Sequence, residues 1–270
     1  MTLWHPGLYV VATPIGNLQD LSPRAAETLR MASTVAAEDT RTSGSLVRGA
    51  GGEGRLVSLT EHNVSQRIPE LLAAARESVV ALVSDAGTPA IADPGARLIA
   101  AAHATGVSVF GIPGPSALAT AVSVAGFDRL PVVFLGFLPR PKGERARALQ
   151  QAAPAGGTVV FFESPARLAA TLGELAALMG DPETVVCREL TKLHEEVTRG
   201  RASALAGQFA NARGECTVVF EAPPKDSTAE ANALLAAMKR AGARQSAAAA
   251  EVARLTGLTR EQCYNLWDRV

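Results

Sequence analysis

Residues 79 to 124 repeat one pattern twice: a short apolar run, a loop rich in Gly and Pro, and an Ala-rich segment with helical periodicity. The first run, Val79 to Val83, has no polar alternation, which is typical of strands covered on both faces in a parallel sheet. The second run, Val107 to Ile112, leads through a Gly-Pro turn to Ser116, a good N-cap for the next helix. The pattern predicts consecutive strand–loop–helix units of an α/β fold.

The loops of these two units are the first candidate for a binding site. In open α/β sheets, ligands bind outside the carboxyl ends of the strands, where neighbouring loops diverge. Gly and Pro also mark ordinary turns, so the loops alone do not distinguish a site from a turn. Asp85 favours a site, because a carboxylate at the end of a buried strand is costly without a partner. We therefore expect a ligand or a helix N-terminus beside Asp85.

Three earlier apolar runs also predict strands: Leu8 to Ala12, Thr34 to Ala37 and Leu56 to Leu59. The loop after the first run contains neither a Gly-x-Gly-x-x-Gly pattern nor a Gly-Lys-Ser/Thr ending, which excludes the two common nucleotide-binding glycine motifs. Ser22-Pro23 then predicts the cap and first residue of a helix that ends near Met31.

Polar residues follow two of these strands directly. Glu38, Asp39 and Arg41 come after the second strand, and His62 follows the third. Such residues either form salt bridges and cap a helix N-terminus, or face the crevice at the carboxyl ends of the strands. Sequence alone leaves both alternatives open.

The second half of the chain predicts another α/β layer. Strands are expected at residues 131–137, 158–162, 184–187 and 216–221, with a helix from Pro165 to Met179. The predicted organisation is two α/β domains in series, residues 1–125 and 126–224, followed by a helical tail at 225–270. A Pro-Pro linker at 223–227 joins the tail to the second domain.

The tail has the features of a helical hairpin. A helical segment ends at Gly257, and Thr259-Arg260-Glu261-Gln262 forms a capping box for the last helix. This spacing suits an αα-hairpin that packs on the body or on a partner, and it also suits a helix-turn-helix that contacts nucleic acid.

The composition limits the class of protein. The formal net charge is zero at pH 7, so any contact with nucleic acid must be local. Cys187, Cys216 and Cys263 lack metal-ligand spacing, which predicts a reduced, cytoplasmic protein without a metal site. The longest apolar stretch, Ala117 to Phe127, is shorter than the roughly 20 residues that span a bilayer. No membrane association is expected.

Five motifs occur in an order that resembles a known family. They are Ala-Thr-Pro-Ile-Gly-Asn-Leu at 12–18, Ala-Glu-Asp-Thr-Arg at 37–41, Ser-Asp-Ala-Gly-Thr-Pro at 84–89 with Asp-Pro-Gly at 93–95, Gly-Ile-Pro-Gly-Pro-Ser-Ala at 111–117, and Arg-Glu-Leu-Thr-Lys at 188–192. Together they are similar to the motifs of the bacterial small-subunit rRNA (cytidine 2'-O)-methyltransferases, within the tetrapyrrole-methylase fold family. The resemblance covers about residues 7 to 222.

The resemblance implies a class III methyltransferase fold, in which S-adenosylmethionine lies in the cleft between two α/β domains, usually in a homodimer. The implied substrate is a cytidine ribose in the decoding region of 16S rRNA, in the small ribosomal subunit. Carried over by position, the residues that line the cofactor site are Ser84, Asp85, Ala86, Gly87, Thr88, Ser116, Ala117, Phe162 and Leu190.

The implied reaction benefits from a base, because a ribose hydroxyl is a poor nucleophile at neutral pH. The catalytic candidates are Glu38, Asp39, Arg41, His62 and Glu163. The base stays unassigned, since each acid can equally form a structural salt bridge. Contacts with RNA phosphates are expected from Arg140, Lys142, Arg145, Arg188 and Lys192.

Two other functions remain open. A methylase of a tetrapyrrole or another small metabolite would share the fold, although such family members carry a Gly-Asp-Pro type loop where this chain has residues 84–89. A non-catalytic RNA-binding module, with the tail as its active surface, is an alternative of another class. Cofactor binding and methyl transfer distinguish the three.

Overall fold

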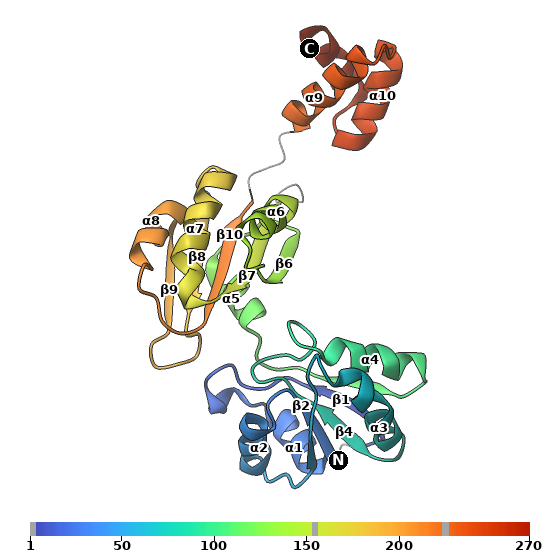
Figure 1. The fold of residues 1–270 in the computed structure, drawn as a ribbon, viewed down its shortest axis with the longest axis vertical. Helices are drawn as coiled ribbons and strands as arrows, with labels where there is room; N and C mark the ends of the chain where they lie inside the picture. The colour runs from blue at the N-terminus through green and yellow to red at the C-terminus, as the bar shows by residue number, and fades with distance from the viewer. Residues whose placement is uncertain (1–3, 153–155, 223–226) are drawn as a thin grey trace.

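The computed structural model describes residues 4–152, 156–222 and 227–270. The expected linker at 223–227 lies outside these residues except for Ser227, where a helix begins. Figure 1 shows two α/β layers in series and a helical unit that stands apart from them. The predicted fold class is confirmed.

The first sheet is parallel, with strand order β3-β2-β4-β1-β5. Its strands are β1 (Gly7–Val11), β2 (Thr34–Ala37), β3 (Arg55–Ser58), β4 (Val79–Leu82) and β5 (Val109–Ile112). β2 and β4 are buried along their whole length, as their unbroken apolar runs predict. All five strands therefore present their carboxyl ends at one edge of the sheet.

Helices cover both faces of this sheet (Figure 1). Apolar side chains of α1 (Pro23–Met31) and α2 (Thr40–Gly49) pack on one face. Those of α3 (Val64–Glu77) and α4 (Gly95–Ala104) pack on the other. α1 has the predicted Ser22 cap and begins at Pro23. α2 follows the polar residues 38–39, and the short 3-10 helix η1 (Leu18–Asp20) lies in the loop after β1.

The second sheet is mixed, with strand order β6-β7-β10-β8-β9. Its strands are β6 (Val132–Phe137), β7 (Thr158–Glu163), β8 (Glu183–Arg188), β9 (Glu196–Arg201) and β10 (Cys216–Glu221), and only β6 and β7 pair in parallel. β9 was not predicted, because its polar and charged residues do not form an apolar run. It is an edge strand with alternating burial, which tolerates such residues.

The two faces of the second sheet are covered by different parts of the chain. α6 (Lys142–Ala152), α7 (Pro165–Met179) and α8 (Ala202–Gln208) pack on one face. The other face packs against α5 (Ala117–Ala125), which is the last helix after the first sheet. Ala121 and Ala125 are buried against Val160 and Val219 there. This shared core brings the loops of the first sheet to the second sheet.

The tail contains three helices, so the prediction of a two-helix hairpin is wrong in helix number. These are α9 (Ser227–Arg240), α10 (Gln245–Thr256) and α11 (Arg260–Leu266), followed by η3 (Trp267–Arg269). α9 adds Leu235 to a core with Val252 and Trp267, which a hairpin alone could not enclose. The capping box at Thr259 is confirmed by both of its hydrogen bonds.

Across the described ranges, every helix is too short or too polar to cross a lipid bilayer.

Candidate functional site

Three loops are tied together at the carboxyl edge of the first sheet. The backbone groups of Thr13 and Gly87 form two hydrogen bonds, of 2.9 and 3.1 Å, between the β1 loop and the β4 loop. Oγ1 of Thr88 donates to the carbonyl oxygen of Pro115 at 3.0 Å, which joins the β4 loop to the β5 loop. Gly87 has a φ of 83°, and a Cβ there would lie 3.2 Å from Ile15. Glycine is therefore required where the loops cross.

Two adjoining chambers lie beside these loops. The first chamber has a volume of about 450 Å³ and lies between the two sheets. It is lined by Ile15, Glu38, Ser84 to Thr88, Ile91 to Asp93, Ser116, Ala117, Phe137, Phe162 to Pro165 and Glu215 to Thr217. The second chamber, of about 640 Å³, is lined by Thr13 to Gly16, Leu18, Leu21, Thr42, Ser45, Leu46, Gly49, Asp85, Ala86, Lys192 and Glu215. Ile15, Asp85, Ala86 and Glu215 line both.

Most of the residues that the resemblance assigned to cofactor binding line the first chamber. Ser84 to Thr88, Ser116, Ala117 and Phe162 all do. Ser116 caps α5 as predicted, by accepting a hydrogen bond from the backbone of Ala119. Leu190 is the exception: it is 7 % exposed and packs in the core between α5 and the second sheet. Its contact with a ligand stays a prediction.

Asp85 has the partner that its position required. Its Oδ1 accepts a hydrogen bond of 2.9 Å from the backbone N–H of Asp39, the residue that caps α2. The carboxylate is exposed to both chambers. The expectation of a helix N-terminus beside Asp85 is thus confirmed.

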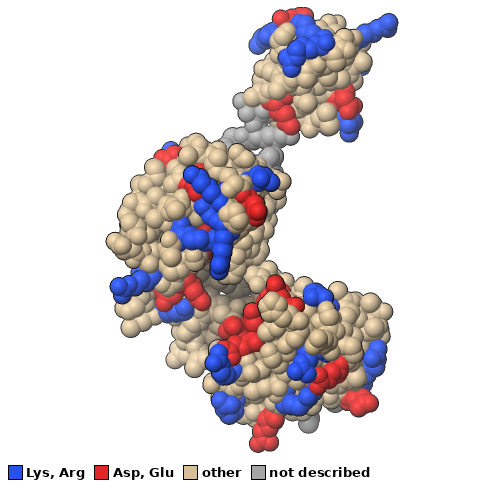
Figure 2. Space-filling view, viewed as in Figure 1, with Lys and Arg blue, Asp and Glu red and all other residues tan. Residues whose placement is uncertain are grey.

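Carboxylates gather on this edge of the first sheet. Partial burial, reinforced by the negative charges of Asp85, Asp93 and Glu61, raises the pKa of Glu38. Burial also raises the pKa of Asp93, although backbone hydrogen bonds from Gly95 and Ala90 oppose it. Figure 2 shows an area of Asp and Glu on the first-sheet half that faces the second-sheet half, where Lys and Arg form a stripe. The edge therefore favours a cationic group in the first chamber.

Asp39 and Arg41 form a local pair at the start of α2. Asp39 caps the helix through the N–H of Arg41 at 2.8 Å and binds its guanidinium at 3.0 Å. The hydrogen bonds from Arg41 lower the pKa of Asp39. The side chain of Arg41 is 91 % exposed and lines neither chamber. Both residues stabilise the helix start, and a catalytic role for either is not supported.

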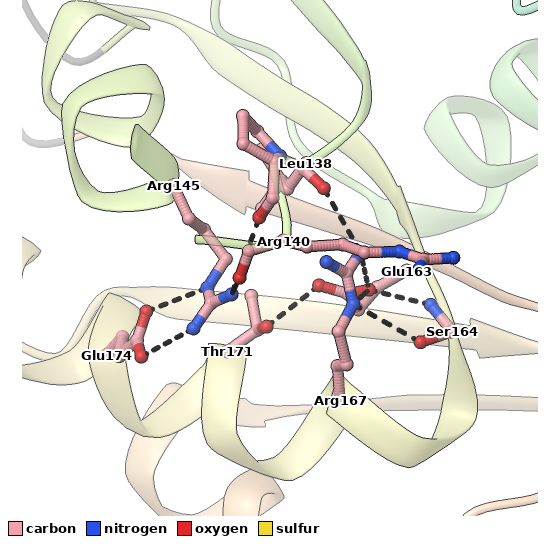
Figure 3. Close-up of polar contacts among 9 residues, drawn as sticks. Leu138, Arg140, Arg145, Glu163, Ser164, Arg167, Thr171 and Glu174 are labelled. Carbon is pink, nitrogen blue, oxygen red and sulfur yellow. Dashed lines mark hydrogen bonds and ion pairs between the residues drawn. The ribbon is translucent and has the colours of Figure 1, made fainter. Parts of the chain in front are cut away.

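Glu163 has the contacts of a structural carboxylate, which favours the salt-bridge alternative over a role as the base. One oxygen accepts from the backbone of Ser164 and from Nε of Arg167, both at 2.7 Å. The other accepts from Thr171 at 2.8 Å. Figure 3 shows these donors converging on the carboxylate from the first turns of α7. The residue is 2 % exposed, and these donors hold its carboxylate in one orientation at the wall of the first chamber.

Arg145 is also corrected, from an RNA contact to a core ion pair. It is 6 % exposed, and its guanidinium binds both oxygens of Glu174 at 2.7 and 2.8 Å. A third bond, to the carbonyl oxygen of Arg140, holds the loop before α6 (Figure 3). A bidentate buried pair of this kind cannot reach RNA without unfolding its helix. Arg140 and Lys142 of the same segment are exposed.

Arg188 and Lys192 both have acidic partners. Arg188 pairs with Glu196 at 3.0 Å. Nζ of Lys192 lies 2.9 Å from carboxylate oxygens of Glu189 and of Glu215. Burial lowers the pKa of the amine, but the hydrogen bonds to these two carboxylates outweigh it, so the pKa of Lys192 is raised. The stem of Lys192 lies against Gly16, so the hairpin between β8 and β9 reaches the β1 loop. Lys192 thereby closes one side of the second chamber.

His62 lines neither chamber and is exposed, so no contact with a ligand there follows from the structure. The sequence analysis missed Phe137 and Glu215 as chamber residues. Phe137 is 63 % exposed, stacks edge-on against Phe162, and ends β6, so the strand-end rule could have found it. Glu215 precedes an antiparallel strand, and nothing in its local sequence indicates a site.

Comparisons with known proteins agree with this architecture. The sequence profile of the Tetrapyrrole (Corrin/Porphyrin) Methylases matches residues 7–206. The chain is 43% identical over 267 residues to "Ribosomal RNA small subunit methyltransferase I" of Mesorhizobium japonicum, covering 96% of this chain and 90% of that protein. It is 44% identical over 216 residues to the protein of the same name from Thermotoga maritima, covering 79% and 97%.

A solved structure shows the same fold. A cobalt precorrin-4 methyltransferase, a cobalamin biosynthetic enzyme, superposes with a TM-score of 0.58 at 18% identity, covering 79% of this chain and 94% of that chain. This likeness concerns the fold alone. The matched profile and the two relatives extend over most of the sequence, and the profile covers the loops after β1, β2, β4 and β5. The chain belongs to the tetrapyrrole (corrin/porphyrin) methylase family.

Proposed function

We propose that this protein transfers a methyl group from S-adenosylmethionine to the ribose 2'-hydroxyl of a cytidine in 16S rRNA of the small ribosomal subunit. The observation that carries the proposal is the likeness over nearly the whole chain to proteins named as small-subunit rRNA methyltransferases. Two chambers that share a wall support it, since transfer between two bound molecules needs neighbouring sites.

The first chamber fits the methyl donor. Its volume lies in the range of small-molecule sites, about 300–1,000 Å³. Phe137 and Phe162 offer apolar ring surface for an adenine. Glu38 and Asp85 supply negative charge for the sulfonium and amino groups. Ala117 and Gly87 leave the backbone of two loops accessible, so a donor can bind closely to both.

The chemistry supplied by the donor is an electrophilic methyl carbon bound to a positively charged sulfur. The protein contributes alignment and electrostatic stabilisation. The bonds from Thr13 to Gly87 and from Thr88 to Pro115 keep the loops in place, so the bound donor keeps one orientation. An acceptor that enters by the second chamber meets the donor at the shared wall.

Partners follow from the same proposal. Arg140, in the loop before α6, and Lys142, the first residue of α6, are exposed and contact RNA phosphates. Three large apolar side chains in one stretch of chain are exposed: Val124 at 46 %, Leu130 at 80 % and Val132 at 42 %. A homodimer would cover them at its interface. Because the proposed substrate is the small ribosomal subunit, the proposed function implies that the protein acts in the cytoplasm.

The test is methyl transfer from tritiated S-adenosylmethionine to unmodified small subunits, with the labelled ribose located by nuclease resistance and mass spectrometry. We expect one labelled cytidine and no label on a precorrin. Cofactor binding without any transfer would instead support a non-catalytic RNA-binding module. Light scattering tests the homodimer.

A further inference from the structure

We propose that the second chamber is the acceptor site, which holds a nucleoside turned out of an RNA strand, and that Asp85 takes the proton of its ribose hydroxyl. This proposal rests on the proposed function. It assigns the substrate side of the reaction, which family membership alone leaves open.

The chamber has the lining that a nucleoside requires. Ile15, Leu18, Leu21 and Leu46 provide apolar surface for a base, and the hydroxyl groups of α2 provide polar contacts. A base inside a stacked strand could not reach the shared wall, so it must be extruded, as in other enzymes that modify nucleotides. Lys192 closes the chamber, and its paired ammonium lies beside the path of the strand.

The shared wall singles out Asp85 among the acids near the chambers. Of the acids that line either chamber, only Asp85 and Glu215 line both, and Glu215 is paired with Lys192 at 2.9 Å. Glu38 and Asp93 line the first chamber alone. Oδ1 of Asp85 is held by the N–H of Asp39, which orients the carboxylate. Among the described residues no hydrogen bond reaches Oδ2, so this oxygen is free to accept one from a hydroxyl.

The ribose hydroxyl gives its proton to Oδ2 of Asp85 while its oxygen forms a bond to the methyl carbon. The carbon–sulfur bond breaks, and its electron pair stays on sulfur, which becomes a neutral thioether. Asp85 then passes the proton to solvent through the exposed side of the chamber. A positioned base of this kind accelerates reactions about 10²–10⁴-fold.

Filling the second chamber tests the acceptor site. Thr42 is exposed on α2 and lines only the second chamber, so Thr42→Trp occupies acceptor space without disturbing the core. We expect the KM for small subunits to rise at least tenfold, with S-adenosylmethionine affinity by calorimetry unchanged. The matched control is Gln66→Trp, an exposed position on α3 outside both linings. Equal KM values in the two variants would overturn the assignment of the chamber.

Asp85→Asn tests the base. The amide oxygen still accepts from the N–H of Asp39, so the loop keeps its anchor. We expect kcat for subunits to fall at least a hundredfold with KM within about threefold, while the calorimetric Kd for S-adenosylmethionine rises less than about tenfold, because Glu38 still supplies negative charge to the donor. Glu53→Gln, which neutralises an exposed carboxylate outside both linings, is the matched control and should keep the parental kcat.

Each outcome separates the two proposals. If the parent protein methylates subunits and Asp85→Asn does so at the parental rate, the inference about the base is wrong and the proposed function stands. If Asp85→Asn loses donor affinity in proportion to kcat, Asp85 is a cofactor residue only. A hundredfold loss in Glu38→Gln with parental turnover in Asp85→Asn would move the base to the first chamber. A parent without any transfer to subunits contradicts the proposed function itself.

Discussion

The hydroxyl of Thr88 donates a 3.0 Å hydrogen bond to the carbonyl oxygen of Pro115, and this bond joins the two Gly-rich loops that frame the first chamber. The loops belong to β4 and β5, which do not pair with each other, because β1 lies between them. Their spacing therefore depends on contacts at the loop tips. The side chain of Thr88 therefore helps to set the width of the first chamber.

Thr88→Ala should weaken donor binding. Loss of one partly buried hydrogen bond amounts to about 1 kcal/mol, which corresponds to roughly a fivefold rise in the Kd for S-adenosylmethionine. Thr88→Ser keeps the hydroxyl and should bind like the parent. Calorimetry measures both variants, and equal weakening in both would show that the methyl group, not the hydrogen bond, sets the spacing.

Glu163→Gln should affect stability more than turnover. Gln replaces one acceptor by a donor, which then faces Arg167 or Thr171, so we expect a loss of about 2–3 kcal/mol in the free energy of unfolding. Denaturant titration gives this value, and kcat measured at 20 °C on folded protein should stay within about threefold. The control is Glu144→Gln, an exposed change on α6. A hundredfold loss of kcat in a stable variant would restore Glu163 as a catalytic candidate.

Glu38 should make stability depend on pH. Its pKa is raised in the folded protein, so the folded state binds the proton more tightly than the unfolded state, and stability falls as pH rises above the ordinary value of 4.5. Glu38→Gln removes the free-energy cost of ionising this partly buried carboxyl group. Its melting temperature should exceed that of the parent at pH 7, and the difference should shrink as pH falls towards 4.5. Glu53→Gln, in an exposed turn, is the control, and a pH-independent difference for Glu38→Gln argues against the charge as its cause.

Arg140 and Lys142 should contribute to RNA affinity through their charges. Replacing both by Gln should reduce the slope of log K against log salt by roughly 1 to 2 units, because fewer counterions are released on binding. The fold should be unaffected, since both side chains are exposed. Filter binding of small subunits across a salt series measures the slope.

The control for that experiment is Arg30→Gln with Arg76→Gln. These residues occupy the last turns of α1 and α3, at the edge of the first sheet opposite the chambers. Their double variant should keep the parental slope. An unchanged slope in the Arg140 and Lys142 variant would mean that these two side chains contact only solvent.

Arg145→Gln should instead lower the melting temperature, because it breaks the buried pair with Glu174.

Removal of the tail should separate cofactor binding from substrate docking. Truncation after Ala222 leaves both sheets intact and removes a unit that has its own core around Leu235 and Trp267. We expect S-adenosylmethionine affinity within about threefold of the parent, a difference of roughly 0.7 kcal/mol. Transfer to subunits should fall at least tenfold if the three helices dock RNA. Parental transfer rates would show that the tail has no part in docking.

Local sequence was sufficient for the strands and caps that lie in regular surroundings. The apolar run at 79–83 predicted β4, and Ser22-Pro23 and the box at Thr259 predicted helix starts that the structure confirms. Such features depend on burial and hydrogen bonds within a few residues. The order of five short motifs was also enough to indicate the family, because each motif lies at or just after the end of a strand, where the loops of this fold form the site.

The roles of the charged side chains were decided only by tertiary structure. Sequence placed Glu163 and Asp85 alike, each directly after a buried strand. The fold surrounds Glu163 with donors from α7, whereas it leaves one oxygen of Asp85 open at the wall between two chambers. In the same way Arg145 received a buried partner 29 residues away and Arg140 did not. The sequence determined which elements form, but the free energy of a charge depends on neighbours that long-range packing brings to it.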